Sequence, residues 1–552
     1  MQEKKKQMIK DVYPTKGQFH KGEEVAVVIE LEEYTIEQLK KTSQELEIIV
    51  THFDKQVFCG KYALELDSRS IQYPIKPFEC GGYGVTIKLG TECMRTAFDV
   101  AKSHHIIPRY GFLSDFTTED TGDEDIKSML RLHMNLVQFY DWMYRHEYLV
   151  ADTKQYMDLM GKSMSTEIVQ KKIDACHRYG MKTMAYGAVY AASKEFYEEH
   201  ADWGMYTNDA KPITFIDLFY IMNIDATCPW HQHIIDQYCT ALKRMDFDGI
   251  HMDTYGYPKS GYDVDKSYIK MDEAFGPLID NTKAALDKVK KETTVIFNNV
   301  GNWPLDVTAK ANQDILYVEV WEPYDKYVHI QRIIHEAKVA SSKSLIISAY
   351  LKPYMYATQE QAFNALALLT ACIIANGSTH LVMGEDKRVL TQGYYVDHYP
   401  VEERYYNAIR KYYDFSVQYA EIFFDKELID VSMTHAYGDN LEYVFEKVET
   451  SPYAQAGKVW TIIREHTTMK VISFINLVGN NEQWNEGKNR PIVQRDMIVK
   501  ILLNQSIEGV YLISPESPKM QKLTYETYDQ GRGTVAVVHV DKIDIWSVLV
   551  VR

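Results

Sequence analysis

The feature that most constrains this fold is a repeat that runs from residue 103 to residue 428. Short apolar stretches alternate there with longer amphipathic stretches that predict helices, such as residues 165–180 and 277–292. Eight consecutive strand–helix units predict a (β/α)8 barrel, also called a TIM barrel. The eight predicted strands cover residues 107–113, 136–141, 182–190, 248–253, 294–299, 315–321, 344–351 and 380–385.

An open, doubly wound sheet is the structural alternative to a closed barrel. Such a sheet seldom runs to eight consecutive units, and no glycine-rich phosphate loop follows any of these strands. The barrel is therefore the favoured interpretation.

The sequence on either side of the barrel predicts two β-domains. Residues 1–102 alternate apolar and polar side chains, which predicts an immunoglobulin-like β-sandwich with one possible helix at residues 35–44. A helix at residues 401–424 is expected to close the barrel. The alternation returns over residues 429–552 and predicts a C-terminal antiparallel β-sandwich.

Charge and hydropathy exclude several kinds of partner. A net charge of -16 argues against nucleic acid and against an anionic membrane, because both require clustered Lys and Arg. No run of about eighteen apolar residues is present, so no membrane-spanning helix is predicted. The basic start at residues 1–14 has no apolar stretch after it. This predicts a cytoplasmic protein, or a secreted one if the sequence is a processed form.

The seven cysteines are scattered and include no CxxC pair. This pattern is a poor disulfide framework and a poor zinc site. We expect buried free thiols in a reducing compartment. The sequence gives no prediction of the oligomeric state.

Acidic side chains follow the ends of several predicted strands. Asp253 ends the fourth strand, Glu319 lies in the sixth, and Asp141 ends the second. Polar residues at the C-terminal ends of barrel strands lie on the catalytic face. Each carboxylate alone could be a structural helix cap, but several on one rim favour a chemical role. Two carboxylates that face each other across a cleft define glycoside hydrolysis, so Asp253 and Glu319 are the candidate pair.

The segments FYDWMYRH (139–146), FDGIHMDTYG (247–256) and YVEVW (317–321) resemble the motifs of glycoside hydrolase family 66. This family contains the endo-dextranases and the cycloisomaltooligosaccharide glucanotransferases. The predicted order of β-domain, barrel and β-domain also matches the family. The resemblance implies retaining cleavage of an α-1,6-linked glucan, such as dextran or isomalto-oligosaccharides, without a metal or another cofactor.

The resemblance also implies roles for individual residues. Asp253 would be the nucleophile, Glu319 the general acid/base, and Asp141 a carboxylate that binds the sugar. As an acid, Glu319 should have a raised pKa because of burial against Trp321 and the nearby charge of Asp253. Glu322 is the rival acid, but residues 319 and 322 point to opposite faces of an extended strand, and the motif favours Glu319.

Further side chains near the strand ends are candidates for sugar binding. Aromatic faces suit sugar rings, although core packing is the competing interpretation for each of them. His251 shares a strand face with Asp253 and could line the same cavity. The predicted set is Tyr140, Tyr186, Trp230, His251, Asn299, Trp321, Tyr350 and Glu385, with Trp142 and Tyr255 as additional aromatic candidates.

Three other functions remain open at the level of sequence. A glucanotransferase would act on the same substrates, and a silent relative would bind sugar without turnover. A metal-dependent barrel hydrolase would need ligands from His251, Asp253, Glu319, His380 and Glu385. The HxH pair common in such barrels is missing, however, and the ligand spacing is diffuse.

Overall fold

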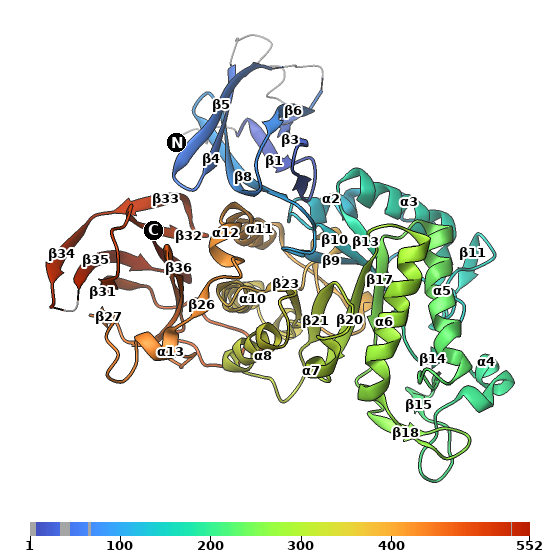
Figure 1. The fold of residues 1–552 in the computed structure, drawn as a ribbon. Helices are drawn as coiled ribbons and strands as arrows, with labels where there is room; N and C mark the ends of the chain where they lie inside the picture. Colours follow the sequence, from blue (N-terminus) through green and yellow to red (C-terminus); the bar gives the residue numbers. More distant parts are fainter. Residues whose placement is uncertain (1–6, 34–44, 65–67, 532) are drawn as a thin grey trace.

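The computed structural model describes residues 7–33, 45–64, 68–531 and 533–552, and the helix predicted at residues 35–44 lies outside them. Figure 1 shows N-terminal strands at the top, a barrel with its helices in the centre and at the right, and C-terminal strands at the left. The domain boundaries expected after residues 102 and 428 stay predictions.

The eight predicted barrel strands form one parallel sheet, in which neighbours follow sequence order. The last strand lies beside the first, so the sheet is nearly closed, as the repeat predicts. The strands are β9 (Tyr110–Leu113), β10 (Leu136–Phe139), β13 (Lys182–Ala188), β17 (Gly249–Asp253), β20 (Thr294–Val300), β21 (Ile315–Glu319), β22 (Leu345–Ser348) and β23 (Thr379–Leu381).

The side chains of these strands alternate between two environments. One set forms a core inside the barrel that includes Tyr110, Leu136, Met184, Ile296 and Tyr317. The other set packs outward against the surrounding helices. The main covering helices are α3 (Thr166–Arg178), α5 (Pro229–Met245), α6 (Met271–Val289), α8 (Tyr327–Ala340) and α10 (Gln359–Ala375).

The start of α3 follows a local signal in the sequence, whereas the start of α6 does not. Ser165 caps α3 by accepting a hydrogen bond from the backbone N–H of Ile168, 3.4 Å away. Helix α6 begins at Met271 rather than at Pro277, where the sequence predicts its start. Burial of Ala274 and Phe275 extends the helix towards its N-terminus and outweighs the hydrogen bond that Pro277 cannot donate.

The N-terminal part contains a five-stranded sheet and a three-stranded sheet that share one apolar core. This arrangement is consistent with the predicted sandwich, and its immunoglobulin-like character stays a prediction. The strands are β1 (Ile9–Pro14), β2 (Phe19–His20), β3 (Glu24–Leu31), β4 (Glu45–His52), β5 (Lys55–Ala63), β6 (Ser70–Pro77), β7 (Gly81–Leu89) and β8 (Glu92–Ala101).

The expectation of buried thiols is wrong for three cysteines. Cys59, Cys80 and Cys93 are exposed, whereas the other four cysteines are buried. Cys59 and Cys93 lie in β5 and β8, where alternate side chains face solvent or a neighbouring part of the protein rather than the core.

The C-terminal part also contains two sheets around an apolar core, one of seven strands and one of four. Strand β34 is largely exposed and lacks the apolar face by which an alternating sequence identifies a strand. The larger sheet contains β26 (Ile429–Asp430), β28 (Thr450–Ser451), β29 (Val459–His466), β30 (Met469–Asn476), β32 (Val510–Ser514), β33 (Ser517–Leu523) and β36 (Trp546–Val551), and the smaller one β27 (Tyr443–Glu446), β31 (Gln494–Leu503), β34 (Tyr525–Asp529) and β35 (Thr534–Ile543).

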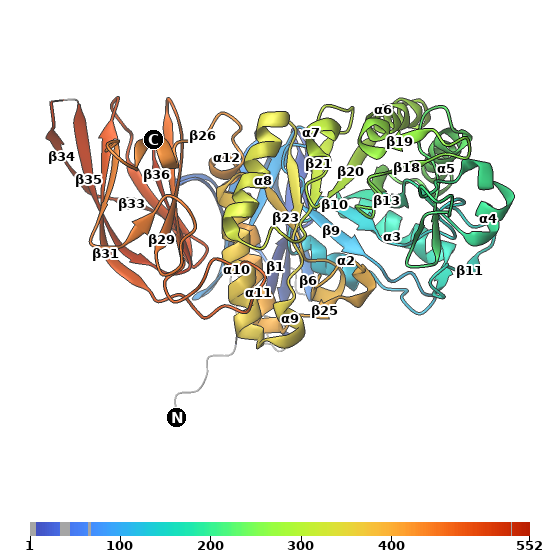
Figure 2. The same cartoon turned by 90° about the horizontal axis from the view of Figure 1, so that it is seen from below.

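Helix α11 (Glu403–Gln418) links the three parts. It packs on β7 and β8 of the N-terminal part, and its residue Phe415 contacts Trp546 of β36 with ring centroids 5.0 Å apart. The short helix α12 (Ala420–Phe423) follows, so the single helix predicted at residues 401–424 is in fact two. Figure 2 shows the C-terminal strands as a separate layer beside α10 and α11.

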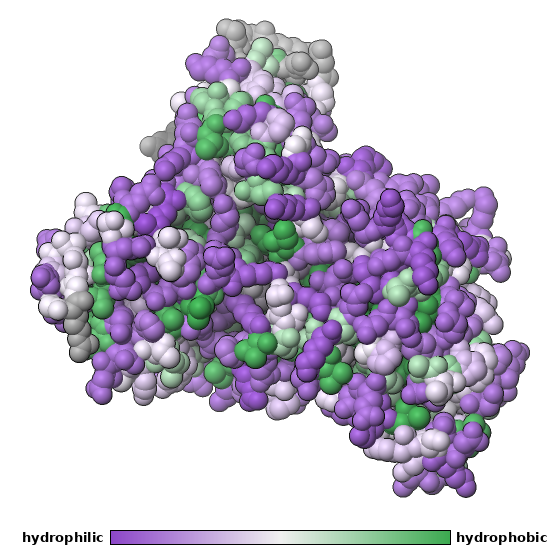
Figure 3. Space-filling view, viewed as in Figure 1, coloured by the Kyte–Doolittle hydropathy of each residue, from purple (hydrophilic) through white to green (hydrophobic). Residues whose placement is uncertain are grey.

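The surface is mostly polar. Figure 3 shows hydrophilic residues over most of one face, with hydrophobic residues only in small groups. Within the described part of the chain, no helix is long and apolar enough to cross a membrane.

A buried ion pair ties the N-terminal part to the start of the barrel. Asp99 of β8 accepts two hydrogen bonds from the Arg109 guanidinium, at 2.7 and 3.1 Å, and both side chains are almost fully buried. Arg109 also donates to the carbonyls of His133 and Gly17. The pair therefore compensates a guanidinium charge that would be costly to bury alone.

We predict that Asp99→Ala lowers the free energy of unfolding by about 3–5 kcal/mol, because it leaves Arg109 charged and buried. Chemical denaturation followed by tryptophan fluorescence measures this loss. The control is Asp152→Ala, which removes an exposed partner of Arg244 and should change stability by less than about 0.5 kcal/mol. Equal effects of the two substitutions would contradict the prediction.

Candidate active site

The C-terminal rim of the barrel carries two carboxylates and one amide on adjacent strands. Asp253 is the last residue of β17, and Glu319 is the last residue of β21. Asn298 lies on β20, which pairs with both of these strands. All three follow an inward-facing residue by two positions, so the strand period points them into the barrel mouth.

The Asn298 carboxamide bridges the two carboxylates. Its Nδ2 donates to Asp253 Oδ1 at 2.7 Å and to Glu319 Oε2 at 2.8 Å. The two acceptor oxygens can therefore be no more than 5.5 Å apart, the sum of these distances. One amide nitrogen thus fixes the separation of the two acids.

Tyrosine hydroxyls occupy the remaining oxygens of the pair. Tyr186 donates to Asp253 Oδ2 at 2.7 Å, and Tyr350 donates to Glu319 Oε1 at 2.6 Å. The Tyr395 hydroxyl lies 3.3 Å from that of Tyr350 and 2.9 Å from that of Tyr317. Each carboxylate is held at both oxygens, so neither is free to rotate.

Burial and mutual repulsion perturb the acidity of both groups. Burial and the charge of Glu319 raise the pKa of Asp253 to about 7, against the lowering effect of the Asn298 and Tyr186 hydrogen bonds. Burial also raises the pKa of Glu319. Like charges this close cannot both ionise freely, so the pair retains one proton into the neutral pH range.

Asp141 lies next to this pair at the end of β10. Its φ of 49° is in the left-handed region, which Asp tolerates better than most residues. Burial raises its pKa to about 7, and its charge in turn raises the pKa of Asp253. A small pocket beside it is lined by Asp141, His146, Asp158 and Phe219, among others.

Several predicted sugar-binding side chains do lie around the pair, in different roles. Tyr140 is half-buried and stacks on Tyr395 with ring centroids 4.3 Å apart. Trp321 is 38% exposed and meets the Tyr350 ring edge-on at 5.7 Å. Tyr186 and Tyr350 are buried and present their hydroxyls to the carboxylates rather than their ring faces to solvent.

The prediction that Trp230 binds sugar is wrong. Trp230 lies in the first turn of α5, its ring is fully buried, and its indole N–H donates to the Val189 carbonyl at 2.9 Å. Trp142 is likewise buried and bonded to the Tyr186 carbonyl, while Tyr255 is half-buried and stacked on Phe215. A ring covered by packing on its faces cannot serve as a sugar platform.

Asn299 is also not a rim residue. It faces out of the barrel, is fully buried, donates to the Tyr317 carbonyl at 2.9 Å, and accepts from the Thr308 hydroxyl at 2.6 Å. The alternation of β20 turns consecutive residues to opposite faces, so only Asn298 reaches the carboxylates.

Glu385 and His251 serve the fold rather than the substrate. The Glu385 carboxylate accepts from the Ser114 N–H and hydroxyl, at 2.9 and 2.6 Å, and pairs with His398 at 2.9 Å. His398, Lys172 and Ser114 lower its pKa to about 2 despite its burial. His251 lies deeper in the barrel against the Tyr110 hydroxyl, and burial lowers its pKa to about 3.

The predicted metal ligand His380 and the rival acid Glu322 both lie away from the carboxylate pair. His380 faces the Ala349 carbonyl at 3.0 Å, away from the pair. In the described residues, no group of three or more His, Cys, Asp or Glu side chains could hold a metal ion. Glu322 is exposed beyond the end of β21, whereas Glu319 is only 8% exposed.

Three residues of the site, Asn298, Gly393 and Tyr395, are not among those predicted from the sequence. Asn298 could have been found, because it lies two residues after Ile296 on the inward face. Gly393 and Tyr395 lie in the loop after β23, which has no periodicity that places them. The Gly393 carbonyl accepts from the Tyr140 hydroxyl at 3.2 Å, and an added Cβ at Gly393 would lie 3.3 Å from Glu319 Oε1.

A (β/α)8 barrel with two close carboxylates on its rim is the arrangement of glycoside hydrolases. The sequence profile of glycosyl hydrolase family 66 matches residues 14–550, nearly the whole chain. The chain belongs to this family, as its motifs predicted.

Named relatives are distant in sequence. A cycloisomaltooligosaccharide glucanotransferase from Niallia circulans is 22% identical over 626 residues, which cover 85% of this chain and 64% of that protein. A dextranase from Streptococcus salivarius is 22% identical over 572 residues, which cover 85% of this chain and 67% of that protein. The chain thus spans about two thirds of the length of the curated relatives it matches.

The fold itself is shared with a solved structure. A cycloisomaltooligosaccharide glucanotransferase from Paenibacillus sp., complexed with cycloisomaltoheptaose, superposes with a TM-score of 0.88 at 21% identity and covers 98% of this chain and 99% of that one. An α-amylase from Geobacillus thermoleovorans gives a TM-score of 0.52 at 10% identity over 82% of this chain and 99% of that one.

The raised pKa of Asp253 predicts a stability that depends on pH. A carboxyl that binds its proton more tightly in the folded state opposes folding once it ionises. The contribution of Asp253 to the free energy of unfolding therefore falls as pH rises from about 4 to 7. Asp253→Asn removes this cost. We expect it to raise the free energy of unfolding at pH 8 by about 1–3 kcal/mol, with little gain near pH 4.

The matched control is Glu385→Gln, where the pKa of the native carboxyl is lowered instead of raised. The ionised Glu385 carboxylate favours folding at pH values above the ordinary pKa of a Glu side chain. Glu385→Gln should therefore be less stable than the wild type at pH 8, and this difference should shrink as pH falls towards 2. Chemical denaturation at several pH values measures both. A destabilised Asp253→Asn at pH 8 would contradict the assignment of a raised pKa.

Proposed function

We propose that this protein is a retaining glycoside hydrolase that cleaves α-1,6-linked glucan, with Asp253 as nucleophile and Glu319 as general acid/base. The observation that carries the proposal is the Asn298 bridge, which limits the distance between the two acceptor oxygens to at most 5.5 Å. Retaining enzymes hold their carboxyl groups about 5–5.5 Å apart, whereas inverting enzymes need about 6.5–9.5 Å to admit a water molecule.

The shared proton of the pair belongs on Glu319 at the start of the reaction. Glu319 is more deeply buried than Asp253, and burial favours the neutral form of an acid. Each carboxylate accepts from the Asn298 amide and from one tyrosine hydroxyl, so burial rather than hydrogen bonding distinguishes them. This difference in burial gives the two acids different tasks at the same pH in the proposal.

In the first step, an oxygen of Asp253 attacks the anomeric carbon as the bond to the leaving glycosidic oxygen breaks. Glu319 transfers its proton to that oxygen, and a β-glycosyl ester of Asp253 forms. Asp141 is placed beside the pair to accept hydrogen bonds from sugar hydroxyls and so stabilise the distorted ring. The ester removes the negative charge next to Glu319, which lowers the pKa of Glu319 for its next task.

In the second step, Glu319 accepts a proton from water as the water oxygen attacks the anomeric carbon. The ester bond breaks, Asp253 leaves as a carboxylate, and the product keeps the α configuration. Side chains and one water molecule supply every group that these two reaction steps require, so the proposal includes no metal or other cofactor.

The family and its named members support the proposed substrate class. The relatives are called dextranase and cycloisomaltooligosaccharide glucanotransferase, and the solved structure holds cycloisomaltoheptaose. We propose a neutral α-1,6-linked glucan or oligosaccharide as partner, which suits a chain of net charge -16. A cytoplasmic location, with isomalto-oligosaccharides as substrate, remains part of the proposal.

Transfer to a sugar is the second candidate function. It uses the same ester of Asp253, but a glucan hydroxyl replaces water in the second step. The names of the two glucanotransferase relatives and of the superposed structure favour it. Product analysis with isomaltotriose separates the two: hydrolysis gives only shorter sugars, whereas transfer also gives longer or cyclic ones.

We predict that Asp253→Ala and Glu319→Gln lower kcat on dextran by about 1000-fold or more, because each removes a group that forms or breaks a bond in the reaction. Glu322→Gln is the matched control and should keep kcat within about threefold, because its exposed side chain takes no part in either step. Near-normal turnover of Asp253→Ala or of Glu319→Gln would refute the roles.

Azide distinguishes the two roles on an activated aryl α-glycoside. With Asp253→Gly, azide should attack from the face that the nucleophile occupied and give a β-glycosyl azide. With Glu319→Ala, azide should attack the enzyme ester and give the α-glycosyl azide. Identical anomers from both variants would show that the assignment is wrong.

We further predict that Asn298→Ala lowers kcat by about 100-fold while the protein remains folded, because the carboxylates lose the donor that aligns them. The variant also loses a hydrogen bond that lowers the pKa of Asp253, so the acid limb of the pH–rate profile should move to higher pH. Asn299→Ala is the control: it should lower stability by about 1–3 kcal/mol and leave the pH profile unchanged. An unshifted profile in Asn298→Ala would count against the bridge.

A further inference from the structure

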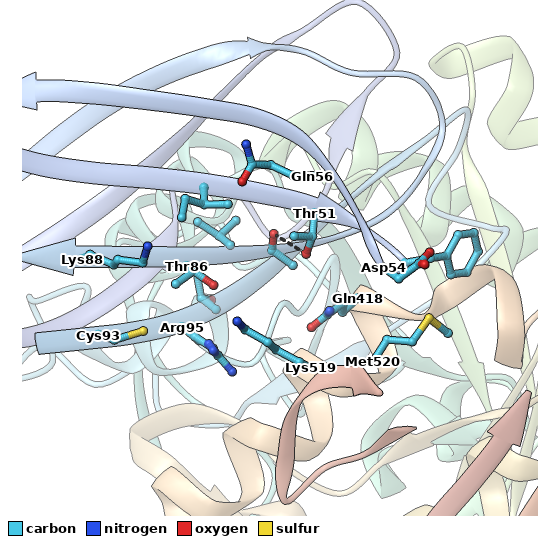
Figure 4. Close-up of a pocket in the computed structure, with 15 residues that line it drawn as sticks. Thr51, Asp54, Gln56, Thr86, Lys88, Cys93, Arg95, Gln418, Lys519 and Met520 are labelled. Atoms are coloured by element: carbon cyan, nitrogen blue, oxygen red, sulfur yellow. Dashed lines mark hydrogen bonds between the residues drawn. The ribbon is translucent and has the colours of Figure 1, made fainter. Parts of the chain in front are cut away.

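A second pocket lies far along the chain from the rim residues, where the three parts of the protein meet. It encloses about 500 Å³ between the outer face of the N-terminal five-stranded sheet, the end of α11 and strand β33. Figure 4 shows the strands of the N-terminal sheet above it and β33 below. The polar lining includes Thr51, Gln56, Thr86, Gln418 and Lys519.

The pocket carries two positive charges that no carboxylate neutralises. Four charged side chains line it. Lys88 is paired with Glu47 at 2.8 Å, and Asp54 is paired with Arg552 at 2.5 Å. Arg95 and Lys519 remain, and neither forms an ion pair with any described carboxylate.

Arg95 is the more constrained of the two cations. The alternation of β8 turns it out of the N-terminal core and into the pocket, and its side chain is half-buried. Its Nη1 is shielded from solvent and has no hydrogen-bond acceptor within the described residues. A guanidinium offers five donors in a planar fork, and a shielded donor without an acceptor costs free energy. Lys519 reaches towards the same space from β33 (Figure 4).

We propose that this pocket binds a phosphoryl oxyanion, either inorganic phosphate or the phosphate group of a small sugar phosphate. Arg95 would provide paired N–H donors, and Lys519 the second positive charge, which together match a dianion. The Thr86 hydroxyl and the Gln418 amide also line the pocket and supply neutral hydrogen-bonding groups. The volume is in the range of small-molecule sites and leaves space for an organic part.

The lining fits an anion better than a neutral glucan. Sugar rings are held mainly on flat aromatic faces, and the only ring in this pocket is that of Phe53. The Arg552 guanidinium lies 4.8 Å from the centroid of that ring, and the His52 ring packs on it at 4.5 Å. A bound anion would contact β7 and β8, α11 and β33 at once, and would therefore stabilise the contact between the N-terminal and C-terminal parts.

The test is titration calorimetry on the full-length chain with inorganic phosphate and with glucose 6-phosphate, in buffers of matched ionic strength set with sodium chloride. We expect saturable binding to the wild type. Arg95→Met and Lys519→Met should each weaken it on the order of 10-fold or more, because each removes a charge-assisted contact. Lys88→Met is the matched control, because Lys88 lines the same pocket but is already paired, and it should stay within about twofold.

The outcomes separate the two sources of the anion. Equal affinities indicate that the phosphoryl group alone is recognised, and about 10-fold tighter binding of glucose 6-phosphate indicates that its organic part is held as well; both support the site. Absence of saturable binding, or equal binding by wild type, Arg95→Met and Lys519→Met, overturns it. Binding of isomaltotriose that is lost in the same variants, without phosphate binding, also overturns it. Lys519 is exposed on β33, so its variant keeps the test valid even where Arg95→Met does not fold.

Discussion

The two-residue period of eight parallel strands decides where every polar side chain of the rim points. Inside the barrel, Tyr110, Ile296 and Tyr317 fill the space between the strands. Two residues further along the same inward face, the positions at the mouth of the barrel hold polar side chains instead. Asp253, Asn298 and Glu319 occupy these positions, on three strands that are neighbours in the sheet. The proposed chemistry thus depends on strand alternation and on strand order, and the surrounding helices serve to hold both in place.

The same period explains what the sequence could and could not predict. The eight strands and both carboxylates were predictable, because apolar runs and terminal acids are local signals. Asn298 was also within reach, since the rule that aligned His251 with Asp253 distinguishes it from Asn299. Trp230 was not, because its burial depends on how α5 packs and on the Val189 carbonyl, which is 41 residues away in the chain. Nor was the role of Glu385 predictable, because Ser114 is 271 residues away in the chain and His398 reaches Glu385 only through the path of the loop after β23.

Three acids of the barrel rim show how the surroundings of a carboxylate decide whether its charge favours or opposes folding. Glu385 is surrounded by hydrogen-bond donors and cations, so its negative charge favours the folded state. Its bonds to Ser114 hold the loop after β23 against the end of β9. Asp253 and Glu319 face each other with only neutral donors between them, so their charges oppose folding. The barrel tolerates this cost because its interior and outer cores are extensive. A site that stores such a penalty can release it when a substrate reacts with one of the acids.

The position of Trp321 makes sugar binding at the barrel mouth observable by fluorescence. All eight tryptophans lie within the described residues, and Trp321 is the most exposed of them; five are buried, and Trp203 and Trp303 are half-buried. Trp321 stands at the mouth of the barrel, edge-on to Tyr350. Emission from an indole responds to the polarity around it, so sugar that displaces water from this ring would change the fluorescence of one tryptophan against a background of buried and half-buried ones. The protein therefore carries an intrinsic optical probe at the entrance of its own candidate active site.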